Sequence, residues 1–383
     1  MFYSPIVTVL EVNTVNLRLL ALKRSEDFFR PIEVLTSTYD GATATGLNKP
    51  DKLFSTIQGL FSTLQQKIKL LPSKVYVQLP QTFIRTFVIE NEIAINGKQV
   101  KKRDVDELYA RCVSPDPHYD VISHAPVSFR SLNHLVMFNP IGEECSRLYG
   151  TISVVALEKS IKEFFDTAAK SLRKTFIYAG ESNSAIEKAD KDLNLPGNAR
   201  ILVNVREEHI SINLCKGKAI IASKFVEWGG NHIIYSLQDL LKINFASARA
   251  MMLKLNLNVN CLDADVYVYN DGDNLAEYGM KAVNKRVIDT LDYIAEQIRA
   301  AIASFRLDAP IPVYVTGHDV CRVRGVKERL LSAIGGEMLI LVSEQINFDS
   351  PSDYPIAGLI EKIHRETGFD INLIKNIGRL KTI

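Results

Sequence analysis

Apolar and polar residues alternate along this chain in a pattern that predicts β-strands near the start of each half. Residues 6–23 read as two strands that meet at Asn13 and Thr14, and the second alternates apolar with polar side chains. Residues 200–228 predict three successive strands, with turns at 206–209 and 215–218. We also expect extended or buried strands over 74–80, 83–95, 124–133, 146–157, 311–317 and 338–343.

Other stretches carry apolar residues at helical spacing. The clearest is 51–71, which ends before Pro72. Asn96 and Gly97 give a turn signal, and a helix is expected to begin shortly after them, near Lys101. Further helices are predicted over 158–172, 230–242, 245–255, 283–305, 323–335 and 354–368.

Each half therefore opens with a β-meander and later returns to a buried strand flanked by helices. Repetition of one plan predicts a duplicated α/β architecture with two lobes and a cleft between them. In such folds ligands lie in the cleft, at the ends of the strands.

Composition and charge remove several classes of function. The 383 residues carry 46 basic and 44 acidic side chains, a net charge of +2, so nothing suggests nucleic-acid binding. No apolar run reaches membrane-spanning length, and no signal peptide is expected. The five cysteines and seven histidines are scattered without ligand spacing, which indicates reduced cytoplasmic thiols and no metal site. No nucleophile, zinc-protease or P-loop motif supports catalysis.

Three stretches of the chain carry recognisable motifs: residues 91–112, residues 127–165 with "NPIG" at 139–142, and residues 229–252, which open on a glycine pair. They resemble the actin/Hsp70 superfamily and, within it, the bacterial cell-division family FtsA. The first two stretches are similar to the start and the continuation of the FtsA-type insert subdomain, and the third resembles the glycine-pair helix of the family and the helix after it.

This resemblance implies an actin-like two-lobed α/β fold, built from duplicated ribonuclease-H-like halves. The first lobe would begin at 1–82, the insert would occupy 83–165, and the chain would return to the first lobe over 166–198. The second lobe would span 199–368, with 229–305 as its smaller subdomain, and 369–383 would form a tail.

The nucleotide motifs depart from the family. The first phosphate turn of the family, D-I-G-T/S, corresponds here to Glu11, Asn13 and Thr14. The family's adenosine motif keeps Thr316 and Gly317, its glycine pair keeps Gly229 and Gly230, and Arg249 replaces an acid. The second phosphate turn has lost its leading aspartate and its three glycines, whose places are taken by Asn204, Arg206, Glu207 and Glu208.

These replacements predict that ATP binding is lost or much weakened. Glycine lets backbone N–H groups approach a phosphate, whereas the new side chains would fill that space and the glutamates would repel phosphate. A single arginine, Arg206, does not rebuild a phosphate cradle. We therefore expect no cofactor, and a solvated hairpin tip over 206–209 without a ligand. In the alternative, ATP with magnesium still binds through Glu11, Thr14, Gly229, Thr316 and Gly317.

The last residues have an amphipathic pattern. Basic amphipathic helices can lie on anionic membranes, and the FtsA family carries such an anchor at its C-terminus. The alternative is a segment that packs against the last helix. The residues concerned are Leu373, Ile374, Lys375, Ile377, Arg379, Leu380 and Lys381.

The resemblance implies a divisome adaptor without enzymatic activity. Such a protein would bind the C-terminal tail of the tubulin-like protein FtsZ, by analogy near 236–305, and would self-associate into filaments or small oligomers. It would contact other divisome proteins and lie on the cytoplasmic face of the inner membrane at the division site. Two alternatives stay open: an ATP-dependent member of the family, and a scaffold of pilus or secretion machinery that clamps a short peptide. The insert argues against the second.

Overall fold

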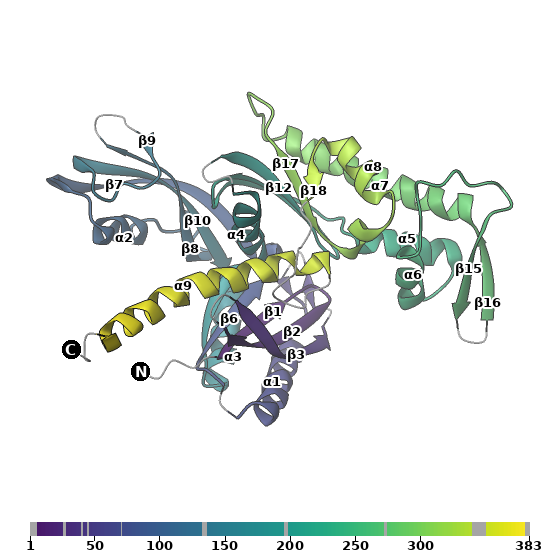
Figure 1. Ribbon diagram of the computed structural model, residues 1–383, viewed down its shortest axis with the longest axis horizontal. Helices are drawn as coiled ribbons and strands as arrows, with labels where there is room; N and C mark the ends of the chain where they lie inside the picture. Colours follow the sequence, from purple (N-terminus) through teal and green to yellow (C-terminus); the bar gives the residue numbers. More distant parts are fainter. Residues whose placement is uncertain are drawn as a thin grey trace.

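A computed structural model describes residues 6–25, 28–39, 41–43, 46–69, 71–131, 136–194, 198–271, 274–338 and 350–379. Two lobes are each built on a five-stranded sheet (Figure 1). In the first lobe, an antiparallel meander of β1, β2 and β3 continues through the parallel strands β6 and β11. Their bounds are β1 Ile6–Val12, β2 Asn16–Arg24, β3 Phe29–Thr38, β6 Lys74–Leu79 and β11 Thr175–Gly180.

The sheet of the second lobe repeats this plan. The meander β12, β13 and β14 continues through the parallel strands β17 and β18, so the strand order is the same as in the first lobe. The predicted duplication is thus visible in the strand order of the two sheets. The bounds are β12 Ala199–Val205, β13 Ile210–Lys216, β14 Ala219–Val226, β17 Val313–Gly317 and β18 Glu337–Met338.

Helices cover both faces of the first sheet. On one face, α1 (Pro50–Lys67) and α3 (Lys159–Ser171) bury their apolar residues against the strands. On the other face, α9 (Tyr354–Arg379) packs Ile356 and Ile360 against Val9 and Leu22. Helix α4 (Glu181–Leu193) runs beside α9 and contributes Ala185, Ile186 and Ala189 to a core shared with the second sheet. The joint between the lobes is therefore packed by α4 and α9.

The second lobe carries its own helices and a two-stranded hairpin at the far end of the molecule (Figure 1). These are α5 Asn231–Leu241, α6 Phe245–Met252, α7 Met280–Ala303, α8 Val326–Ile334, β15 Val266–Asp271 and β16 Asn274–Gly279. Short elements complete the chain: β4 Ala42–Thr43, β5 Gly46–Leu47, η1 Gln81–Phe83, η2 Asp319–Arg322 and η3 Pro351–Asp353. Within the described residues, no helix has the length and apolarity that crossing a bilayer demands.

A four-stranded sheet with its own apolar core follows the first part of lobe one, within the range expected for the insert. Its elements are β7 Ile84–Gln99, α2 Lys102–Ala110, β8 Tyr119–Ser131, β9 Val136–Met137 and β10 Glu144–Glu158. The prediction of a turn at Asn96 and Gly97 is wrong. Both residues have positive φ, but they lie inside β7, where the pairing with β10 shifts register, so they form an irregularity in one strand.

Several elements differ from the sequence prediction. Strands β3, β11 and β16 and helix α4 had no predicted counterpart, and α9 continues through residue 368 to Arg379 without a break. Only Met338 of the strand expected over 338–343 lies within the described residues. In the tail, Leu380 and Lys381 lie outside them, so its amphipathic face stays a prediction.

The contact between α4 and α9 gives a stability prediction. A β-carbon at Gly358 of α9 would lie 1.9 Å from the Ser184 carbonyl oxygen, whereas one at Gly59 of α1 would meet nothing within 4 Å. We expect Gly358→Ala to lower the free energy of unfolding by about 1–3 kcal/mol through overpacking. Gly59→Ala, the matched control, should raise it by about 0.5–1 kcal/mol. Urea denaturation measures both, and equal effects of the two changes would refute this packing.

Candidate functional site

Two turns face each other where the lobes meet. One joins β1 to β2 and carries Asn13 and Thr14, and the other joins β12 to β13 and carries Arg206 to His209. Both turns lie at the carboxyl ends of the first strand of their meander. These are the places where the family resemblance puts the two phosphate turns, so the predicted site residues do converge.

Arg206 spans the gap between the turns. Its side chain is 2% exposed. One terminal nitrogen, Nη2, donates to Oδ1 of Asn13 over 2.7 Å, and the other, Nη1, donates to the Ser352 carbonyl over 2.7 Å. One arginine of the second lobe thus bonds directly to the first lobe and to the segment that leads into α9.

Three carboxylates surround the same guanidinium. Glu181 Oε2 lies 3.2 Å from Nε of Arg206, Glu207 Oε2 lies 3.7 Å from it, and Glu11 Oε1 lies 3.8 Å from Nη2. We call Arg206 with its five partners the Arg206 network. A charge so fully removed from water is tolerated only when it is paired and hydrogen-bonded, and this network provides both.

The protonation of these groups follows from their pairing. Burial opposes ionisation of Glu181, but attraction to Arg206 and the hydrogen bond from His209 outweigh it and lower the pKa of Glu181. Burial is likewise outweighed at Glu207, whose pKa is lowered chiefly by Arg206. Arg206 itself has a raised pKa, since its carboxylate partners overcome its burial. Glu181, Glu207 and Arg206 are therefore ionised at neutral pH.

Arg18 of β2 adds a second link beside the first. It contacts the Glu11 carboxylate and, over 2.5 Å, Oδ1 of Asp353 in η3. Burial raises the pKa of Asp353, and the attraction of Arg18 reduces this rise only in part. Glu11 thus lies between two arginines, Arg18 and Arg206.

The expectation of a solvated tip at 206–209 is wrong. Arg206 and His209 are buried, and His209 Nε2 lies 2.9 Å from Oε1 of Glu181. Glu208 is directed toward α5, where its Oε1 accepts hydrogen bonds from Asn231 and Tyr235 over 2.8 and 2.6 Å. The tip is instead enclosed by the first lobe, α4 and α5, and long-range contacts of this kind leave no local sequence signal.

Three further predicted site residues, Gly229, Gly230 and Gly317, allow close packing around this turn. A β-carbon at Gly229 would lie 2.4 Å from the Glu207 carbonyl oxygen, and one at Gly230 would lie 2.0 Å from the His318 ring. Gly317 has a φ of +117° and its absent β-carbon would meet Val205 at 1.9 Å. These glycines let the ends of β12 and β17 and the start of α5 approach closely.

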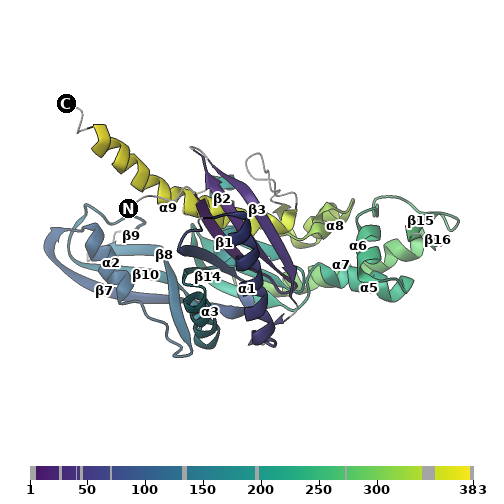
Figure 2. The ribbon, with the colours of Figure 1, turned by 90° about the horizontal axis from the view of Figure 1, so that it is seen from below.

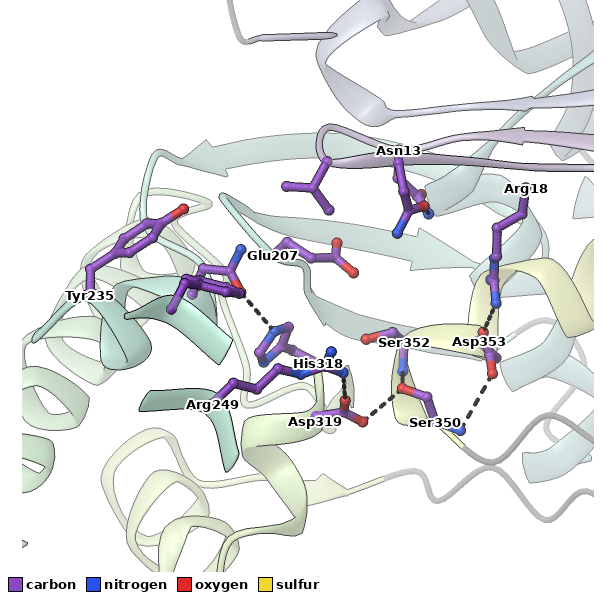
Figure 3. A pocket seen from close by; sticks show the side chains of 14 residues that line it. Asn13, Arg18, Glu207, Tyr235, Arg249, His318, Asp319, Ser350, Ser352 and Asp353 are labelled. Atoms are coloured by element: carbon purple, nitrogen blue, oxygen red, sulfur yellow. Dashed lines mark hydrogen bonds and ion pairs between the residues drawn. The ribbon is translucent and has the colours of Figure 1, made fainter. Parts of the chain in front are cut away.

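An open cavity of about 420 Å³ remains in the cleft (Figure 3). Arg249 of α6 lies at its wall and pairs with Asp319 over 2.6 Å, and Asp319 also accepts from Ser350. Missed by the sequence analysis were the wall residues Val15, Asn16, Arg18, Asn231, Tyr235, Phe245, His318, Asp319, Ser350, Ser352 and Asp353.

The residues present fit a triphosphate between the two turns poorly. Arg206 and Asn13 are in direct contact there, and Glu207 faces the cavity. Among the described residues, no group of three or more acidic, histidine or cysteine side chains is arranged to hold a metal ion. Yet both polar atoms of Asn204 and the hydroxyls of Thr14 and Thr316 are buried without a hydrogen-bond partner in the described structure.

A second cavity, of about 560 Å³, lies between the second lobe and the insert. Its walls include β14 and β7, and each of these is an edge strand of its own sheet. Buried oxygens of Gln81, Thr82 and Thr86 have no hydrogen-bond partner among the described residues. We call this cavity the groove; it is lined by Gln81, Thr82, Ile84, Arg85, Thr86, Tyr119, Glu158, Ser223, Lys224, Phe225 and Glu227.

Comparison with known proteins identifies the fold. No protein-family model and no curated protein sequence matches this chain. Among solved structures, the PilM-PilN type IV pilus biogenesis complex aligns at 12% identity with a TM-score of 0.62, over 93% of this chain and 98% of that one. MreB5 of Spiroplasma citri bound to AMPPNP aligns at 11% identity with a TM-score of 0.53, over 99% of both chains. The ethanolamine utilization protein EutJ from Carboxydothermus hydrogenoformans aligns at 12% identity with a TM-score of 0.50, over 94% of this chain and 90% of that one.

This chain therefore has the actin-like ATPase fold, and the predicted α/β fold class is confirmed. The similarity establishes the fold alone, while membership of the actin/Hsp70 superfamily and of the FtsA family stays a prediction.

The Arg206 network predicts a large effect of one substitution. Arg206→Met keeps a long side chain but removes the arginine partner of the buried Glu181 and Glu207 carboxylates, so it should lower the free energy of unfolding by about 3–5 kcal/mol at pH 7. The matched control is Arg147→Met, which breaks an exposed pair with Glu92 and should cost at most about 1 kcal/mol.

The difference in stability between the wild type and Arg206→Met should depend on pH. In the wild type, the lowered pKa values of Glu181 and Glu207 stabilise the fold above the unfolded pKa of about 4.5, and this contribution is lost as the pH falls through the folded values. In Arg206→Met the pKa values of Glu181 and Glu207 should rise, so the stability deficit of this variant relative to the wild type should be smaller at pH 5 than at pH 7. Denaturation curves at pH 5 and pH 7 measure this, and a deficit that does not change with pH would contradict it.

Proposed function

We propose that this chain is an actin-like adaptor that works by binding other proteins, without nucleotide chemistry. The observation that carries this proposal is the direct bond between Arg206 and Asn13. An internal cation joins the two turns between which the family resemblance would put the phosphates, so the lobes have a link that requires no ligand. Glu207 beside it would repel phosphate.

We infer further that the partner is an extended peptide held in the groove. Two strands that form sheet edges in the described part of the chain, β7 and β14, flank this cavity, and sheet edges bind peptides by adding a strand.

The tail of an inner-membrane pilus or secretion protein is the partner that we favour. PilM, which this chain resembles in fold, is described in a complex with PilN. The groove also lies outside 236–305, the region that the FtsA resemblance implies for the FtsZ tail. Pilus or secretion scaffolding is thus our first candidate for the cellular role.

The divisome adaptor is the second candidate, and the insert supports it. Strands β7 to β10 and α2 form a separate sheet with its own core, where the resemblance to FtsA implies an insert subdomain. In this role the chain would bind FtsZ, self-associate, contact other divisome proteins and lie on the cytoplasmic face of the inner membrane at the division site. Co-sedimentation with anionic vesicles, compared with a chain truncated before Asn372, tests the membrane contact.

Mg-ATP should not stabilise this protein. A ligand that binds only the folded state stabilises it by mass action, by about 2.7 kcal/mol at a hundredfold excess over Kd. Because Arg206 occupies the space between the turns, we expect no saturable shift in melting temperature up to millimolar Mg-ATP. The unpartnered atoms of Asn204, Thr14 and Thr316 favour the opposite outcome, and a saturable shift would establish an ATP-binding protein.

Filling the groove should abolish peptide binding. Thr86 lines the groove from β7, so Thr86→Trp should weaken binding of a labelled tail peptide at least about tenfold, which corresponds to 1.4 kcal/mol. Thr36→Trp, on the exposed face of β3, is the matched control and should change nothing. Fluorescence anisotropy with a pilus-protein tail and an FtsZ tail measures both. Binding that Thr86→Trp leaves intact would place the peptide elsewhere.

A further inference from the structure

One buried carboxylate lies between the cleft and the groove. Glu181 is the first residue of α4 and is almost fully buried. Its Oε2 pairs with Nε of Arg206 at 3.2 Å, on the side of the cleft. Its Oε1 lies 2.9 Å from Nε2 of His209. The same carboxyl group thus serves two neighbours in different directions.

Two residues that hydrogen-bond the Glu181 carboxylate, His209 and Gln81, connect it to the groove. The His209 ring stacks on the Phe225 ring, with centroids 4.8 Å apart and an interplanar angle of 25°. Phe225 belongs to β14 and lines the groove. Gln81, another groove residue, gives a backbone hydrogen bond to the Glu181 carboxylate. The groove therefore contacts Glu181 from β14 through His209 and from η1 through Gln81.

Through its ion pair with Arg206, Glu181 is also connected to the contact between the lobes. Arg206 is the residue that bonds across to Asn13 and to the Ser352 carbonyl. A shift of Glu181 changes the position or the pairing of Arg206, because the guanidinium is almost fully buried and solvent does not readily replace a lost partner there. Coupling between distant sites is carried by such contiguous packed and hydrogen-bonded groups.

We propose that occupation of the groove and the link between the lobes are coupled through Glu181, with a bound peptide strengthening the Arg206 network. This proposal rests on the proposed peptide site. A peptide over Phe225, which is 36% exposed, covers that ring and excludes water from it, and so holds the stack with His209. Removal of water around the ring also strengthens the electrostatic pairing of His209 with Glu181. By linkage, an intact network in turn favours the peptide-binding form of the groove.

Hydrogen exchange on the peptide-free chain tests this coupling from the cleft side. Asn13→Ala removes one partner of Arg206 without touching the groove. We expect amide exchange in 81–86 and 219–226 to rise at least about fivefold, the lower end of ordinary coupling between sites. Arg249→Ala breaks the other cleft ion pair, with Asp319, and should leave these segments unchanged. Exchange in α7 reports global stability, and the change in 81–86 and 219–226 is measured relative to it in each variant.

Hydrogen exchange also tests the coupling from the groove side, with a substitution in the groove and a readout in the cleft. Phe225→Leu keeps an apolar side chain but removes the ring stack, so exchange should rise in 13–16 and 352–354. Phe138→Leu, at an exposed phenylalanine of the insert, is the control and should not affect these residues. The proposal is overturned if Asn13→Ala and Phe225→Leu each act only on their own side.

Peptide titration separates this proposal from the proposed function. If a pilus-protein or FtsZ tail binds and Asn13→Ala changes neither its affinity nor groove exchange, the peptide site stands and the coupling fails. If neither tail binds but exchange changes on both sides, the coupling stands and the peptide partner is wrong.

Discussion

The buried positive charge of Arg206 is the constraint on which the arrangement of the lobes depends. A guanidinium that has lost its water needs carboxylates and carbonyls at fixed positions, and no single element of this chain supplies them. They come from the β1–β2 turn, from the start of α4 and from η3. The strand ends of both sheets must therefore converge on one point, and the packing of α4 and α9 between the lobes holds them there.

The same fold can thus be held together in two chemically different ways. The family resemblance implies glycine-rich turns in a nucleotide-binding member, where a ligand would bring its own charge to the joint. In this chain larger side chains stand where the resemblance implies glycines in one turn, and the charge is part of the chain, while Gly229, Gly230 and Gly317 allow close packing behind it. Fold class therefore says little about the chemistry at the joint, which depends on a few side chains.

Much of the architecture could be predicted from the sequence because period and turn signals are local. The first hairpin, the second meander and most helices follow from such signals. Helix α4 was missed because its buried face consists largely of small or polar residues such as Ala185, Ala189 and Ser184. The solvated tip was a wrong prediction for another reason. Arg206 and His209 look exposed beside two glutamates, but the partner Asn13 lies 193 residues away and Ser352 lies 146 residues away. No local pattern reports a partner at that separation.

Helix α9 gives the joint a mechanical aspect. It begins immediately after Ser352 and Asp353, the two residues that contact Arg206 and Arg18, and its 26 residues make a rod roughly 39 Å long. Its far end extends beyond the first lobe (Figure 2). A rod held at one end by buried charges and packed along part of its length is a lever. A force that pulls or tilts the distal end of α9 would therefore act as a torque on the contact between the lobes.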